Sequence, residues 1–199
     1  QARLLSGSID DNILQQPVVA LVNSDARQET AANHTATHLL HAALQKEISD
    51  SIFQAGSLVA PDRLRFDFRY GQALTKEQLK KLEERVNREV QAGRDVNIHV
   101  DVERDTAVEE MGATAIFGEK YGDKVRVVQI PGESVELCGG THVQNTAEIG
   151  AFRITSESSV GAGIRRIEAV TGTGAMAVYR QERALIEELN NLLKTDAKH

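Results

Sequence analysis

Residues 29–48 read ETAANHTATHLLHAALQKEI, and this stretch decides the fold. Its alanines and leucines favour an α-helix, and neither glycine nor proline interrupts it over about five turns. Apolar residues occupy more than one side of the expected helix, whereas a helix on the protein surface carries a single apolar stripe. The sequence therefore predicts a helix that is buried on most of its sides.

Strands and a second helix are predicted around this central helix. Leu64, Phe66 and Phe68 alternate with charged residues, which indicates a strand with one buried face, and residues 52–60 are expected to pair with it. Thr75 and Gln78 form a capping-box pattern at the start of a helix that ends at Gly93. Further strands are expected at 18–22, 96–102, 125–130, 151–156 and 164–171, a short helix at 105–111 ending at Gly112, and a helix that leaves the domain at 176–194.

These elements predict an α+β fold, in which a mostly antiparallel sheet carries helices 29–48 and 75–92 on one face. The 199 residues are 41% hydrophobic and 26% charged, as in ordinary globular proteins, so disordered and fibrous classes are excluded. The net charge of −6 excludes a globally basic nucleic-acid-coating protein. The single cysteine forbids an internal disulfide and suggests a reducing compartment such as the cytoplasm. No apolar run approaches the length of a membrane span, so no membrane association is expected.

Two pairs of metal-binding residue types share the same spacing. His34 and His38 lie four residues apart on the central helix, so both rings lie on one side, one turn apart. Cys138 and His142 are also four residues apart, and Gly139 and Gly140 between them permit a tight turn. One thiolate and three imidazoles form a nitrogen and sulfur set that suits one tetrahedral zinc ion. The sequence leaves open whether this zinc is structural or catalytic.

Other polar residues are weaker candidates. Arg65 and Arg69 share the polar side of the 64–68 strand, and Arg165 and Arg166 follow a glycine-rich turn, so these arginines are candidates for local RNA contacts. His41 is expected to be a packed residue near the metal rather than a proton carrier. His99 is expected to face solvent.

Several motifs together resemble the editing domain that alanyl-tRNA synthetases share with free-standing deacylases. They are Asn33 to Leu44 (NHTATHLLHAAL), Gly56 to Val59 with Pro61 to Phe68 (GSLV and PDRLRFDF), Phe117 to Asp123 (FGEKYGD), Ser134 to Val143 (SVELCGGTHV) and Gly163 to Ala169 (GIRRIEA). Threonyl-tRNA synthetases carry a related second additional domain, but the Cys-Gly-Gly-Thr-His motif favours the alanyl branch.

The resemblance implies a three-part organisation and an activity. Residues 1–27 would be the end of a preceding β-barrel subdomain, 28–172 the editing domain, and 173–199 a helical linker toward a C-terminal domain. The implied activity is hydrolysis of the ester bond that joins serine or glycine to mischarged tRNA(Ala). The remaining synthetase domains, including the aminoacylation domain that uses ATP, would lie outside this chain.

The resemblance also assigns the site residues. His34, His38, Cys138 and His142 would bind one Zn²⁺ ion, and Thr37, Gln54 and Ser57 would line the pocket, with Thr37 the first choice for recognising the seryl hydroxyl. The backbone N–H groups of Gly139 and Gly140 are hypothesised to stabilise an oxyanion. An alternative reading is a tRNA-binding module whose zinc is purely structural. A zinc peptidase is disfavoured because no glutamate follows His34 directly.

Overall fold

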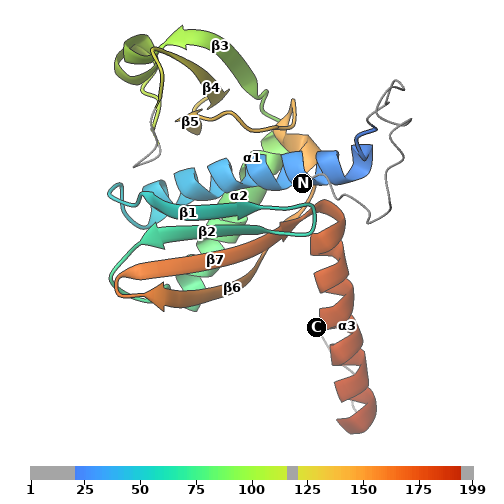
Figure 1. Ribbon diagram of the computed structural model, residues 1–199. Helices are drawn as coiled ribbons and strands as arrows, with labels where there is room; N and C mark the ends of the chain where they lie inside the picture. Colours follow the sequence, from blue (N-terminus) through green and yellow to red (C-terminus); the bar gives the residue numbers. More distant parts are fainter. Residues whose placement is uncertain (1–20, 116–120, 194–199) are drawn as a thin grey trace, which may run out of the picture.

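The computed structural model describes residues 21–115 and 121–193, and its organising element is the long helix α1 (Ser24–Glu47). Figure 1 shows α1 running between two separate sheets, which explains why nearly every residue from Ala31 to Leu44 is buried. The helix begins five residues before the predicted start, because Asn23 caps it by accepting a hydrogen bond from the Ala26 N–H. The boundary predicted between residues 27 and 28 lies inside this helix.

The larger sheet lies on one side of α1 and has four antiparallel strands in the order β1 (Gln54–Val59), β2 (Leu64–Arg69), β7 (Ile164–Thr171) and β6 (Phe152–Gly161). Phe66 and Phe68 of β2 point into the main core, with Leu82 and Val86 of α2 (Lys76–Ala92). The helices α1 and α2 therefore cover the same face of this sheet, as predicted. The capping box of Thr75 and the left-handed Gly93 bound α2 as predicted.

The smaller sheet lies on the opposite side of α1 (Figure 1). It has three antiparallel strands in the order β3 (Asn97–Glu103), β4 (Lys124–Ile130) and β5 (Ser134–Leu137). The α+β class and the antiparallel pairing are confirmed, but the strands form two sheets rather than one. Strand β5 was not predicted, because its four residues are too few to show a period.

The prediction for the faces of β3 is wrong. Ile98 is 44% exposed and Val100 is 64% exposed, whereas His99 is half-buried and its Nε2 lies 3.2 Å from Gln129 Oε1. The pairing with β4 shifts between His99 and Val102, and Asp101 in this bulge has a left-handed backbone with φ of 55°. A bulge changes which residues face the partner layer, so simple alternation fails along this strand.

Short helical turns and a last helix complete the described fold. The short helix predicted at 105–111 is a π-type turn, η2 (Thr106–Glu110), and a 3₁₀ turn, η3 (Thr146–Ile149), follows the Cys-Gly-Gly-Thr-His loop. Helix α3 (Gly172–Leu193) leaves the sheets, as Figure 1 shows, and buries only Ala175. Most of the strand predicted at 18–22 lies outside the described residues. No helix in the described ranges is long and apolar enough to cross a membrane.

Candidate metal centre

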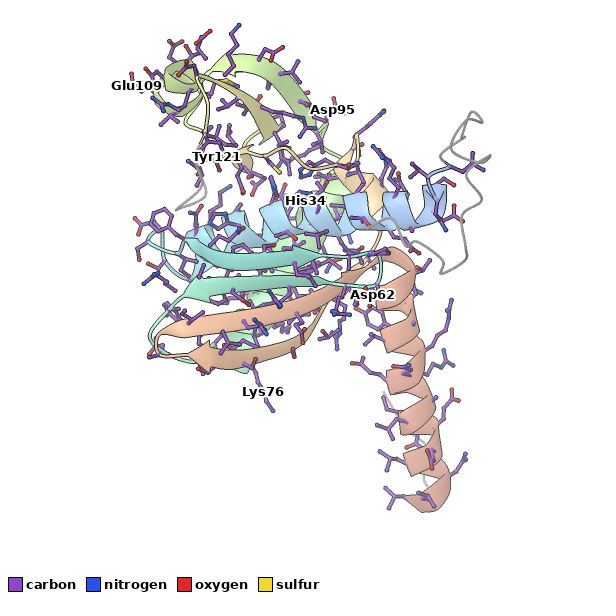
Figure 2. All side chains as sticks on the ribbon, viewed as in Figure 1. His34, Asp62, Lys76, Asp95, Glu109 and Tyr121 are labelled. Atoms are coloured by element: carbon purple, nitrogen blue, oxygen red, sulfur yellow. The ribbon has the colours of Figure 1, made fainter. Side chains whose placement is uncertain are left out.

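The four predicted metal ligands converge on one point between α1 and the loop that follows β5. His34 and His38 come from α1, and Cys138 and His142 come from the loop; Figure 2 places His34 on the side of α1 that faces the smaller sheet. Cys138 Sγ lies 3.4 Å from Nε2 of both His34 and His142. One ligand atom from each of the four residues lies within 4.8 Å of every other. Residues a hundred positions apart therefore form one cluster.

This cluster fits a tetrahedral zinc ion. Zinc–nitrogen and zinc–sulfur bonds place neighbouring ligand atoms of a tetrahedron roughly 3.3 to 3.8 Å apart, and the two sulfur–nitrogen distances of 3.4 Å fall in that range. The donor set of three imidazoles and one thiolate is also the set that zinc prefers over magnesium or calcium. The residues that the structure brings together could therefore hold one metal ion, and their donor set is one that suits zinc.

Burial keeps the three imidazoles neutral, with lone pairs available for a metal. Desolvation, with the charge interaction of His38, lowers the pKa of His34 to about 4. Desolvation, with the charges of His38 and His34, lowers the pKa of His142 to about 2. Desolvation likewise lowers the pKa of His38. Neutral imidazole is the form that binds metal, so no proton has to leave these rings at neutral pH.

We expect the metal-free protein to lose stability as the pH falls from about 6.5 toward 4. In that window an unfolded His34, with its ordinary pKa of 6.5, takes up a proton, while the folded side chain stays neutral down to about 4. The unfolded state then binds more protons, so the free energy of unfolding falls as the pH falls. Thermal unfolding with a chelator present, compared above and below pH 6.5, measures this change. A melting temperature that stays constant across this window would contradict the expectation.

The Cys-Gly-Gly-Thr-His loop is held by Arg126 of β4. The half-buried Arg126 donates through Nη1 to the carbonyl oxygen of Cys138 at 2.7 Å and to that of Gly140 at 2.8 Å. The N–H of Cys138 donates in turn to the Arg126 carbonyl at 3.0 Å. The strand therefore fixes the loop at both ends of its tight turn.

Gly140 lies against the His34 ring. A Cβ atom added at Gly140 would lie 2.1 Å from His34 Cε1 and 2.4 Å from its Nδ1, so the close approach requires glycine. The N–H of Gly140 faces Cys138 Sγ at 3.5 Å, and this is a contact that supports the sulfur. At Gly139, by contrast, an added Cβ would meet nothing within 4 Å.

Thr35 orients His142 from the side away from the cluster. Its hydroxyl oxygen lies 3.1 Å from His142 Nδ1, 3.1 Å from the Ala31 carbonyl oxygen and 3.2 Å from the Val143 N–H. If the hydroxyl donates to Ala31, it accepts from both His142 and Val143, so every group is satisfied. This arrangement leaves Nε2 of His142 for the metal.

The predicted pocket residues lie on α1 and β1. Thr37 is buried and donates its hydroxyl hydrogen to the Asn33 carbonyl oxygen at 2.8 Å. Asn33, one turn earlier on the same side of α1, donates to the carbonyl oxygens of Ala60 and Pro61 just after β1. Thr37 therefore lies on the side of α1 that faces β1, three residues after His34.

A β-bulge places Gln54 and Ser57 on the same face of β1. Gln54 pairs with Phe68 and Ser57 pairs with Phe66, and the register shifts between Gln54 and Gly56. Residues three apart on a regular strand point to opposite faces, but the bulge adds one residue and reverses this. Both side chains thus share the face of Phe66 and Phe68, against which α1 packs.

The four arginines are not a single group. Arg65, Arg69 and Arg166 lie on the sheet face turned away from α1, whereas Arg165 pairs with Phe68 and shares the helix-covered face. Arg166 forms a two-pronged ion pair with Asp67, and Arg165 pairs with Glu157. Arg65 Nε lies 3.7 Å from Asp67 Oδ2, while Arg69 is exposed.

Glu136, a buried carboxylate of β5, was missed by the sequence reasoning. Its Oε1 accepts from Ser134 Oγ at 2.9 Å and lies 3.3 Å from Nδ1 of His41, whose ring is buried as predicted. Burial opposes ionisation of Glu136, but the nearby His38 and the hydrogen bond from His41 outweigh it and lower its pKa to about 2. The sequence feature that could have identified Glu136 is an acidic residue between two apolar residues, two positions before Cys138.

Comparisons with known proteins show what this chain is similar to. Residues 125–168 match the family model described as the threonyl and alanyl tRNA synthetase second additional domain. An alanine–tRNA ligase from Thermoanaerobacter sp. (strain X514) is 51% identical over 195 residues, covering 96% of this chain and 22% of the relative. Those from Chlorobaculum tepidum and Thermotoga maritima are 53% and 51% identical, covering 90% and 89% of this chain.

The match covers nearly all of this chain but only a small part of each relative. The chain spans about a fifth of the length of the curated relatives that it matches. Residues 125–168 are therefore similar to the second additional domain of the threonyl and alanyl tRNA synthetases, and nearly the whole chain is homologous to a segment of alanine–tRNA ligases.

Proposed function

We propose that this chain is the editing part of an alanine–tRNA ligase, a cytoplasmic translation enzyme, and hydrolyses the ester bond of tRNA(Ala) mischarged with serine or glycine. The observation that carries the proposal is the cluster of three histidines and Cys138 on α1 and the loop after β5, in a chain homologous to alanine–tRNA ligases. The products are the free amino acid and intact tRNA.

Editing answers a discrimination problem that a single binding site cannot solve. A site that accepts the methyl group of alanine cannot strongly reject glycine, which is smaller, or serine, which adds one hydroxyl. A second site can reverse the preference if it holds a polar group that the seryl hydroxyl satisfies and alanine leaves unpaired.

We assign the recognition of serine to Thr37. Because its hydroxyl hydrogen is committed to the Asn33 carbonyl, its lone pairs are the part that remains available. Thr37 would therefore accept a hydrogen bond from the seryl hydroxyl, while Gln54 and Ser57 of β1 would contact the amino acid or the terminal ribose from the facing strand.

The four clustered side chains would hold the zinc ion. Once bound there, zinc would supply a Lewis acid that can polarise an ester carbonyl or acidify water. Other residues of the chain hold the ligands in position: Thr35 orients the ring of His142, and Arg126 fixes the loop that carries Cys138. Arg69, exposed on the outer sheet face, would meet the tRNA backbone, and Arg65 and Arg166 lie on the same face.

The experiment that tests the proposal measures release of labelled serine from Ser-tRNA(Ala), with Ala-tRNA(Ala) as the control substrate. We expect zinc-loaded protein to release serine and spare alanine, and we expect chelated protein to release neither. A folded, zinc-loaded chain that releases no serine at saturating tRNA would contradict the proposal and favour the alternative, a tRNA-binding module with structural zinc.

Replacing Thr37 by valine should slow the release of serine by about 10- to 100-fold, because a hydrogen bond to the seryl hydroxyl is lost while the side-chain shape is kept. Release of glycine, which has no hydroxyl, should change much less. Thr30→Val is a matched control, since Thr30 makes the same bond to a carbonyl four residues earlier, that of Ala26 at 2.7 Å, two turns before Thr37. Equal slowing of serine and glycine release would argue against recognition by Thr37.

A further inference from the structure

Glu136 lies between two histidines of α1, His38 and His41. Its side chain is 9% exposed, and its Oε2 lies 3.8 Å from Nδ1 of His38. Its other oxygen, Oε1, is held by Ser134 Oγ at 2.9 Å and by His41 Nδ1 at 3.3 Å. The carboxylate is therefore fixed on one side and has one oxygen directed toward a metal ligand.

The His38 ring has a nitrogen without a hydrogen-bond partner that faces this Glu136 oxygen. Nδ1 of His38 is buried and has no hydrogen-bond partner. A buried polar atom left without a partner is unfavourable by about 1–3 kcal/mol, so such atoms are rare. Glu136 Oε2 is the acceptor that faces it, and a small tilt of the ring would shorten 3.8 Å to a hydrogen bond. With Nδ1 directed at Glu136, Nε2 is the nitrogen left for the cluster.

The charges around the cluster also favour a nearby carboxylate. Three neutral imidazoles and one thiolate leave a divalent ion with a net charge of +1, and the guanidinium of Arg126 adds a second positive charge against the loop. Unbalanced charge is costly in a buried site. Glu136 supplies a negative charge 3.8 Å from His38, the candidate ligand with the smallest exposed fraction, 4%.

We propose that Glu136 is the positioning residue of the metal site: it accepts the Nδ1–H of His38, fixes the tautomer that presents Nε2 to the metal, and balances the charge of the bound ion. His41 and Ser134 hold the carboxylate in place for this task. The inference rests on the zinc site of the proposed function and extends it to the surrounding shell. Carboxylate–histidine pairs of this kind hold metal ligands in many proteins.

The test is the affinity of the chain for zinc, measured by competition with a chromophoric chelator and without any tRNA. Glu136→Gln keeps the shape and removes the charge, and we expect it to weaken zinc binding by about 10- to 100-fold. Glu133→Gln is the matched control, since Glu133 is a carboxylate in the turn just before β5 with an 8% exposed side chain, and it pairs with Lys46 and Arg85 instead of the cluster. We expect its zinc affinity to be unchanged. Equal affinity of Glu136→Gln and the unaltered chain would overturn the proposal.

A second measurement covers the case in which Glu136→Gln does not fold. In the zinc-loaded, unaltered chain, nitrogen NMR of the imidazoles should show a proton on Nδ1 of His38 and none on Nε2. Ser134→Ala, which removes only the bond to Oε1, should weaken zinc binding by less than Glu136→Gln. A proton on Nε2 of His38 in the zinc-loaded chain would overturn the assignment.

The proposed hydrolysis and the proposed role of Glu136 can be contradicted independently. Because the affinity assay contains no ester substrate, a chain that ranks the variants as expected but releases no serine would contradict only the proposed hydrolysis. A chain that releases serine while Glu136→Gln binds zinc normally would contradict only the role of Glu136.

Discussion

Replacing Cys138 by alanine should abolish both zinc binding and release of serine. The sulfur lies 3.4 Å from Nε2 of two of the other three candidate ligands, so its removal would deprive the ion of one of its four ligands. Loss of a residue that only hydrogen-bonds a metal ligand typically weakens metal binding by about 10- to 100-fold. Loss of a ligand itself should therefore weaken zinc binding by more than about a hundredfold. Zinc affinity and single-turnover serine release are the measurements.

The same variant separates the two readings of the site. If zinc takes part in hydrolysis, Cys138→Ala loses activity under conditions where thermal unfolding shows that it is still folded. If zinc only supports the fold, any change in function should follow the fraction of unfolded protein. Full serine release by a folded, zinc-free Cys138→Ala protein would contradict the zinc-dependent mechanism.

Replacing Gly140 by alanine should have the second-largest effect. The added methyl group would lie 2.1 Å from His34 Cε1, closer than any real contact, so either the His34 ring or the loop must move. Arg126 holds the loop through the carbonyl oxygens on both sides of Gly139, so we expect the ring to move out of the cluster. Zinc affinity should fall by about 10- to 100-fold or more, with serine release falling in parallel.

Gly139→Ala is the control for this change. It lies one residue away in the same turn, and its added Cβ would meet nothing within 4 Å. We expect Gly139→Ala to bind zinc and release serine as the unaltered chain does. Equal effects of the two substitutions would show that the turn needs two glycines for its backbone conformation, and that contact with His34 is not the reason for Gly140.

The elements of secondary structure were predictable because their signals are local. The box formed by Thr75 and Gln78 and the glycine at 93 determine α2 through contacts within a few residues. The charged and apolar alternation of residues 64–69 likewise identifies β2. The proximity of His34 and His38 was also predictable, because a spacing of four on a helix fixes the relative positions of two rings.

The details of the site were not predictable, because they depend on strand pairing and on approach between distant segments. The bulge that brings Gln54 and Ser57 to one face follows from pairing with β2, and no local pattern marks it. Arg165 and Arg166 lie on opposite faces of β7 because strand neighbours alternate.

The sequence by itself determined the main helices, most of the strands and the identity of a zinc-type donor set, since each is encoded in residue type and short-range spacing. Only the tertiary structure decided that the strands form two sheets around α1, that Gly140 must be small to admit His34, and that Glu136 faces His38. The physical reason is that these features arise where segments about a hundred residues apart meet, and their contacts depend on packing that no single stretch of sequence contains.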